Sequence, residues 1–172
     1  MLTDPDAQTF DARALNWRFV TPSEPAGMLL LPAEDEWIPW AVTPFGTAGA
    51  LAEAFRTGPY PGVAIPDVHR WARIADSDAV TLLDAAAGAV APGGWLYAGF
   101  ANPWYPLRAI RGSLRIGKAL DVIRRCGLSS PDVYFVFPDQ RRPAYLMPRD
   151  GRVELEFFLD RFFVPYADGE GA

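Results

Sequence analysis

The amino-acid sequence predicts an α/β sandwich with a mostly parallel sheet. Two patterns indicate this class of fold: apolar runs of strand length alternate with apolar stripes at helical spacing, and two further strand-like runs near the end of the chain can pair as a hairpin. The 17 prolines are spread along the chain, so each element is expected to be short. At 172 residues, of which 50% are apolar, the chain can bury one ordinary core.

The sequence predicts a single domain over residues 14–166. The segments at either end, 1–13 and 167–172, consist largely of polar or small residues without apolar periodicity. They are expected to be a loose N-terminus and a disordered tail, because they offer little apolar surface for packing.

The first part of the chain contains one apolar segment and two short strand candidates. Leu15 to Val20 is an apolar, aromatic segment that ends at a Thr-Pro pair. Gly27 to Leu31 is predicted to be a buried strand, because Pro32 stops its run of apolar side chains. Trp40 to Thr43 is a candidate for a second strand.

The middle of the chain is predicted to form helix, strand and helix. Apolar residues recur at helical intervals from Thr47 until Gly58-Pro59 ends the run. Gly62 to Pro66 is a predicted strand with Asp67 at its carboxyl end. A helix over 79–90 follows, preceded by aspartate and serine residues that can cap it.

The last part of the chain is predicted to form a helix, a hairpin and another helix. The first helix covers 113–126 and closes at Gly127. Val133 to Phe137 and Ala144 to Met147 then pair as antiparallel strands. An amphipathic helix over 153–164 completes the fold.

A family resemblance rests on the stretch VAPGGWL at 90–96, in which Ala91 to Gly94 form a predicted turn before a strand over Trp95 to Phe100. This stretch resembles the L-x-P-G-G-x-L turn that leads into the fifth strand of class I S-adenosylmethionine-dependent methyltransferases. The last helix and the hairpin also look like those of that family, so the likeness covers 62–150. It implies a Rossmann-like three-layer sandwich with a C-terminal antiparallel hairpin and a shortened N-terminal half.

The cofactor motifs of that family are degenerate in this chain. Family members hold the cofactor with a glycine-rich turn after the first strand and an acidic residue at the end of the second. Here residues 32–39 contain no glycine, two prolines and three carboxylates, and the strand at 40–43 ends without a carboxylate. No cofactor is therefore expected. Gly46 and Gly49 open a helix, and they would bind S-adenosylmethionine if the site is non-standard; the other interpretation is a flexible helix start.

His69 is the single histidine, which excludes a multi-histidine metal site. With Asp67 two residues before it at a strand end, His69 is a candidate general base that Asp67 orients. The alternative is a surface histidine in a loop that Asp67 caps. No metal ligands are predicted.

Asn102, Trp104 and Tyr105 follow the strand that resembles the fifth strand of the family. The resemblance implies that they border the acceptor pocket, where the two aromatic rings could stack on a planar substrate. The alternative is that these rings bury an edge of the shortened sheet.

Aromatic residues beyond an obvious core predict a protein interface, which would make the chain a homodimer or a subunit of a heteromer. Each aromatic side chain buries about 150 to 250 Å². At roughly 25 cal/mol per Å², three or four of them supply a gross drive on the order of 10 kcal/mol. The residues are Trp17, Phe19, Trp37, Trp40, Trp104, Phe157, Phe162 and Phe163. A small-molecule or peptide ligand is also possible.

The charge and the apolar runs set further expectations. The formal charge of −5 creates no general attraction to nucleic acid or to anionic lipid. Apolar runs of membrane-spanning length and a signal peptide are missing from the sequence, which predicts a cytoplasmic protein. Cys126 is the single cysteine, so no intramolecular disulfide can form.

The sequence thus predicts a methyltransferase-fold protein with a degenerate cofactor site. It would act as a partner or helper subunit, or as a repurposed pathway protein, for example in natural-product biosynthesis or modification. The alternative is an active S-adenosylmethionine-dependent methyltransferase that modifies a small molecule or peptide. Whether a reaction is catalysed stays open at this point.

Overall fold

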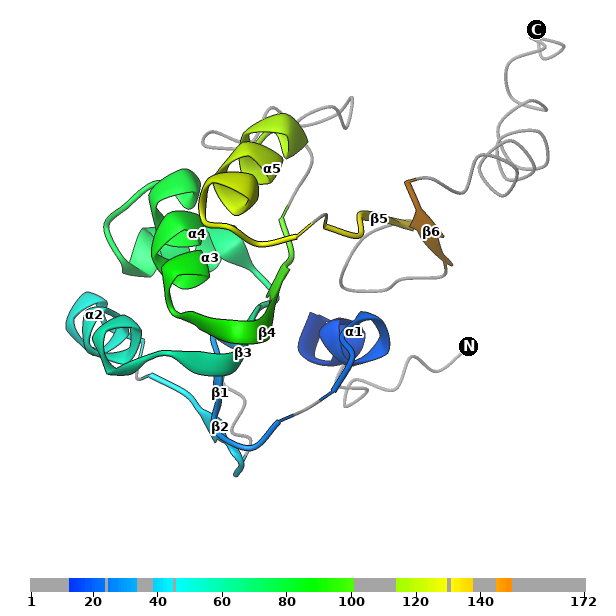
Figure 1. The fold of residues 1–172 in the computed structure, drawn as a ribbon. Coiled ribbons are helices and arrows are strands. Elements are labelled where there is room, and N and C mark those ends of the chain that lie inside the picture. Colours follow the sequence, from blue (N-terminus) through cyan, green and yellow to red (C-terminus); the bar gives the residue numbers. More distant parts are fainter. Residues whose placement is uncertain are drawn as a thin grey trace, which may run out of the picture. The chain divides into compact units, whose positions relative to one another are not determined.

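A computed structural model describes residues 13–23, 25–33, 39–44, 46–100, 114–129, 131–137 and 145–149 (Figure 1). The chain divides into two units, residues 1–131 and 132–172.

The first unit is built on a four-stranded sheet in which every strand pair is parallel (Figure 1). The strand order is β2-β1-β3-β4. The strands are β1 (Met28–Leu30), β2 (Ala41–Val42), β3 (Tyr60–Ile65) and β4 (Val90–Ala98). This sheet, flanked by helices, confirms the predicted α/β class and is compatible with a Rossmann-like fold.

Strands β1 and β3 are apolar on both faces because both faces of the sheet are covered. Leu29 pairs with Val63, and these two side chains belong to the larger of two core clusters. Their neighbours Leu30 and Ala64 also pair, and their side chains belong to the smaller cluster. The alternation follows from the period of two along a strand.

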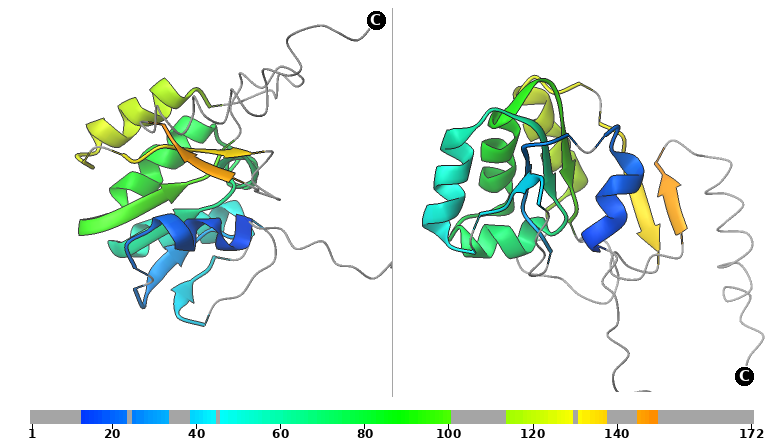
Figure 2. Two further views of the ribbon diagram at one scale, coloured as in Figure 1. Left: turned by 90° about the vertical axis from the view of Figure 1, so that its right-hand side faces the viewer. Right: turned by 90° about the horizontal axis from the view of Figure 1, so that it is seen from below.

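Four helices contribute to the larger cluster: α2 (Ala48–Thr57), α3 (Val68–Ile74), α4 (Ala79–Gly88) and α5 (Ile116–Arg125). Figure 2 shows α2, α4 and α5 on one side of the sheet. Side chains from all four helices are buried there, including Leu51, Trp71, Leu83 and Val122. This face therefore holds most of the hydrophobic core.

The opposite face of the sheet is covered by α1 (Arg13–Val20), the helix drawn in blue in Figure 2. Trp17 of this helix stacks on Trp95 of β4, with ring centroids 6.1 Å apart. Trp17 was expected in an exposed aromatic face, and this expectation is wrong because its side chain is fully buried. A parallel sheet needs cover on both faces, and Trp17 supplies much of that cover here.

Helices α2 and α4 begin where the sequence predicts. Thr47 caps α2 by accepting a hydrogen bond from the amide of Ala50 at 3.2 Å. Asp78 caps α4 by accepting from the amides of Val80 and Thr81 at 2.8 and 2.9 Å. In both cases a side-chain oxygen satisfies amides that the first turn leaves without a partner.

Helix α3 was not predicted, and His69 therefore lies in a helix rather than in a loop. Its buried residues Val68, Trp71 and Ala72 do have helical spacing. The helix has only seven residues, so this spacing does not repeat and gives little signal in the sequence.

The predicted Pro-Gly-Gly turn belongs to strand β4, which corrects the expected start of that strand at Trp95. Tyr60 pairs with Val90 and Gly62 pairs with Trp95, so 91–94 on β4 face Pro61 alone on β3. This irregularity is a bulge, and Gly93 within it has a φ of +78°. The extra residues are accommodated without ending the pairing.

Helix α5 and the C-terminal hairpin confirm two further predictions. Gly127, with a φ of +76°, follows the end of α5. In the second unit, β5 (Tyr134–Phe137) pairs antiparallel with β6 (Tyr145–Pro148). The predicted helix over 153–164 and the terminal segments 1–12 and 167–172 lie outside the described residues, so the domain limits stay a prediction.

Candidate functional site

The strand order places a candidate site at the carboxyl ends of β1 and β3. The chain moves from β1 to β2 on one side and then crosses to β3 on the other side of β1. Open parallel sheets bind ligands at the carboxyl ends of the strands where the order changes direction in this way. The residues that follow β1 and β3 are therefore the strongest candidates for ligand binding or catalysis.

Asp67 is held at the end of β3 by two different groups. Its Oδ1 accepts a hydrogen bond from the amide of Arg70 at 2.9 Å, which caps helix α3. Its Oδ2 lies 2.5 Å from Nη1 of Arg13, the first residue of α1. The side chain of Arg13 is only 9% exposed and that of Asp67 20%. The strand-end carboxylate is thus neutralised by a buried guanidinium group.

The backbone after β1 is covered by two side chains of α3. The indole Nε1 of Trp71 donates to the carbonyl oxygen of Pro32 at 2.8 Å, and the guanidinium of Arg70 donates to the carbonyl oxygen of Ala33. Trp71 is 1% exposed, and the backbone segment 31–33 is buried as well. These contacts close the space directly beside the end of β1.

We call one group of four residues the carboxyl-end clamp: Arg13, Asp67, Arg70 and Trp71. They join α1, the end of β1 and the start of α3 at one edge of the sheet. Arg70 and Trp71 stand close to His69 in the sequence but carry no recognised motif. Arg13 lies in a segment expected to be loose, so no signal in the sequence selects it.

His69 is the second residue of α3 and is partly buried. Its Nε2 is buried and has no hydrogen-bond partner in the part of the chain that the structure describes. The structure brings Asp67 and His69 to the same strand end but gives both carboxylate oxygens of Asp67 other partners. A base at His69 would therefore act without the predicted orientation by Asp67.

Gly46 and Gly49 lie at the start of α2, as predicted, and both are exposed. A Cβ at either position would meet no atom of the described residues within 4 Å, so the packing of those residues requires neither glycine. Their role in cofactor binding stays a prediction. Asn102, Trp104 and Tyr105 lie outside the described residues.

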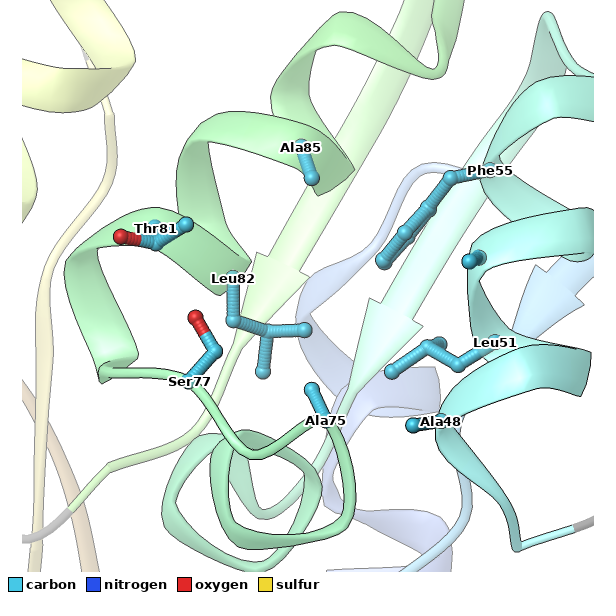
Figure 3. Close-up of a pocket in the computed structure, with 9 residues that line it drawn as sticks. Ala48, Leu51, Phe55, Ala75, Ser77, Thr81, Leu82 and Ala85 are labelled. Carbon is cyan, nitrogen blue, oxygen red and sulfur yellow. The ribbon is translucent and has the colours of Figure 1, made fainter.

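An apolar pocket of about 150 Å³ lies between α2 and α4 (Figure 3). Leu51, Phe55 and Leu82 point toward one another in it. Thr81 at its rim donates its hydroxyl to Asp78 at 3.0 Å. The pocket is smaller than the roughly 300 Å³ at which ligand sites begin, and its lining offers no charged group. The polar side chains of its lining are those of Ser77 and Thr81, and the Thr81 hydroxyl is already bonded to Asp78, so few polar groups remain to orient a substrate.

Two large apolar residues of the first unit are exposed at the β2 edge of the described sheet. Trp40 is 43% exposed and Val42 41%. The guanidinium carbon of Arg18 lies 5.9 Å from the ring centroid of Trp40 and 5.3 Å from that of Trp17. Arg18 thus joins the buried ring to the exposed one by cation–π contacts.

Burial is the main cause of the pKa shifts of Tyr97 and Cys126. Burial raises the pKa of Tyr97 on β4 to about 12. Burial, and then the nearby carboxylate of Asp84, raises the pKa of the Cys126 thiol. A thiol with a raised pKa is a poor nucleophile at neutral pH, which favours a packing role for this residue.

The described residues contain neither a cluster of metal ligands nor a helix that could cross a membrane. No three side chains among His, Cys, Asp and Glu come together there as metal ligands would. None of the helices described is long and apolar enough to cross a membrane.

Comparison of the chain with protein-family models, with curated proteins and with solved structures finds no match. The fold of the described residues alone therefore assigns the chain to a structural class. It is an α/β protein with a parallel sheet, helices on both faces, and a strand-order reversal at β1.

Proposed function

We propose that this chain is a class I methyltransferase-fold protein whose cofactor site is closed. It acts as a partner or helper subunit of a fuller enzyme, or as a repurposed pathway protein. The strand order supports this assignment. The order 3-2-1-4-5-6 of doubly wound sheets contains the observed order β2-β1-β3-β4 once one strand-helix unit of the first half is removed.

The carboxyl-end clamp is the observation that carries the proposal. In cofactor-binding sheets of this kind, the first turn is rich in glycine so that its backbone can approach the ligand closely. In this chain the carbonyl oxygens of Pro32 and Ala33 at that turn are bound by Trp71 and Arg70. A nucleoside would have to displace both side chains, one of which is almost completely buried.

A subunit role is supported by the exposed apolar residues at the β2 edge. Trp40 and Val42 leave apolar surface in water beside a strand whose outer edge is unpaired in the described sheet. Exposed strand edges with apolar side chains are places where another chain can pair. Burial of Trp40 on a partner would remove this exposure.

Isothermal titration calorimetry with S-adenosylmethionine and with S-adenosylhomocysteine tests the closed site. We expect no binding heat at micromolar ligand, and adenosine serves as the control for binding of the nucleoside alone. One-to-one binding of S-adenosylmethionine at micromolar affinity would overturn the proposal.

The alternative function is an active methyltransferase with a non-standard site. The buried Nε2 of His69, which has no hydrogen-bond partner among the described residues, favours it. An imidazole nitrogen at the start of α3 could accept a proton from a substrate that came within hydrogen-bond distance of it. His69→Ala is expected to leave the fold intact. If methyl transfer is detected, this variant should lose it; unchanged transfer would remove His69 from the site.

A further inference from the structure

Helix α1 is attached to the sheet by a more polar face than the helices on the other side. Among its described side chains, those of Arg13, Asn16 and Trp17 are buried, and two of these three are polar. The buried residues of α4 are all alanine or leucine. Apolar burial is the main favourable term in packing, so two of the three buried side chains described in α1 contribute less to docking than the apolar side chains of α4 do.

Part of the gain from Trp17 is offset by polar atoms that docking leaves unsatisfied. Nε1 of Trp17 and Nε1 of Trp95 are both buried, and neither has a hydrogen-bond partner in the described part of the chain. The same holds for Oγ1 of Thr21, which directly follows the helix. A buried donor without an acceptor costs about 1 to 3 kcal/mol.

The helix also has little stability of its own. It has eight residues, whereas isolated helices shorter than about 12 residues are marginal in water. When α1 leaves the sheet it should therefore unwind at the same time. Opening of this segment is then a single local step rather than the movement of a rigid helix.

We propose that α1 is a releasable cover: it opens from the folded protein as a unit while the rest of the first unit stays folded. Opening breaks the ion pair between Arg13 and Asp67 and exposes the face of the sheet that contains Met28 and Leu30. The strand-end carboxylate and this apolar face become accessible together. This inference goes beyond the proposed function and does not depend on it.

Hydrogen exchange followed by mass spectrometry on the full chain tests the cover. The amide of Thr21, bonded to the carbonyl of Trp17 at 3.0 Å, reports on α1. The amide of Leu82, bonded to the carbonyl of Asp78 at 3.0 Å, reports on α4. We expect protection in α1 to be at least about tenfold lower than in α4. Equal protection in the two helices would mean that α1 opens only with the whole protein, and would overturn the inference.

A variant pair separates local release from general destabilisation. Arg13→Met removes the ion pair with Asp67 and should accelerate exchange in α1 several-fold while exchange in α4 is unchanged. Arg56→Met is the matched control, since its ion pair with Glu53 joins side chains that are 72% and 61% exposed. The Arg56→Met variant should leave the rate of hydrogen exchange unchanged in both α1 and α4. If Arg13→Met accelerates hydrogen exchange equally in α1 and α4, then α1 does not open as a separate unit.

Discussion

A single side chain can stabilise a helix end, and at the start of α4 the charge of Asp78 contributes to this stabilisation. Hydrogen bonds from the backbone and hydroxyl of Thr81 are the main causes that lower the pKa of Asp78. We predict that Asp78→Ala reduces the free energy of unfolding by about 1 kcal/mol at neutral pH, because the cap of α4 is lost. The folded pKa lies below the unfolded one. The contribution is therefore complete above about pH 4 and is lost as the pH falls through the folded pKa.

Asp78→Asn is the control for this effect of charge. Its amide oxygen can still accept hydrogen bonds at the helix start, so its stability should be close to that of the natural protein at neutral pH. In this variant, the free energy of unfolding should lose the part of its dependence on acidic pH that the Asp78 carboxylate contributes. Urea unfolding at neutral and acidic pH measures both variants, and an Asp78→Ala variant as stable as the natural protein would contradict the capping role.

Tyr97 leads to a prediction at alkaline pH. Its pKa is raised to about 12 because burial disfavours the phenolate. The unfolded chain loses this proton near pH 10, so the free energy of unfolding falls as the pH rises from about 10. An ultraviolet titration of tyrosinate should show a late step that Tyr97→Phe removes. The pKa of Tyr60 is also raised, so Tyr60→Phe is needed to separate the two. Titration of all tyrosines together would contradict the burial of Tyr97.

Gly94 is required by a close approach of two backbones at the bulge. A Cβ at this position would lie 2.8 Å from the carbonyl oxygen of Pro61 and 3.0 Å from that of Ala91. We predict that Gly94→Ala lowers the free energy of unfolding by about 1 to 3 kcal/mol, because backbone atoms cannot move aside easily. Gly88→Ala is the control, since its Cβ would meet nothing within 4 Å. Chemical denaturation should find that variant neutral or more stable.

At the scale of elements, the carboxyl-end clamp couples three segments of the chain. A double-mutant cycle with Arg13→Met and Asp67→Asn should give a coupling energy of about 1 to 3 kcal/mol, because the pair is largely buried. The exposed pair of Arg56 and Glu53 should give less than about 0.5 kcal/mol in the same experiment. Equal coupling in the two pairs would show that the clamp contributes no more than a surface ion pair.

The elements differ in how well the sequence predicts them. The strands β1 to β4, the caps of α2 and α4, and the hairpin β5-β6 follow local patterns, so they could be predicted. Helix α3 is too short to repeat its apolar spacing, and α1 carries Arg13 and Asn16 on its buried side, where apolar residues are expected. These two helices build the candidate site together with β1. Asp67 and His69 were correctly placed at one strand end, but the partners of Asp67 come from segments whose structure was not predicted.

At the scale of the whole molecule, the exposed residues at the β2 edge predict association. We expect light scattering at micromolar protein to give twice the chain mass of 18.9 kDa if the chain is its own partner. Trp40→Ser should then shift the protein toward the monomer, while Tyr134→Ser, an exposed residue of the second unit, should not. A clean monomer for the natural chain would contradict self-association and favour a small-ligand role.

The sequence by itself determined the α/β class, the parallel strands, the helix caps and the lack of a glycine-rich turn after β1. These features depend on residues close together in the chain, where side-chain period and turn chemistry decide the local structure. Only the tertiary structure decided that Arg13 neutralises Asp67, that Trp71 and Arg70 cover the end of β1, and that Trp17 is buried. These contacts join residues 37 to 54 positions apart, or rings on separate elements. No local pattern specifies such pairs, because they form only when the sheet brings its strand ends and its two faces together.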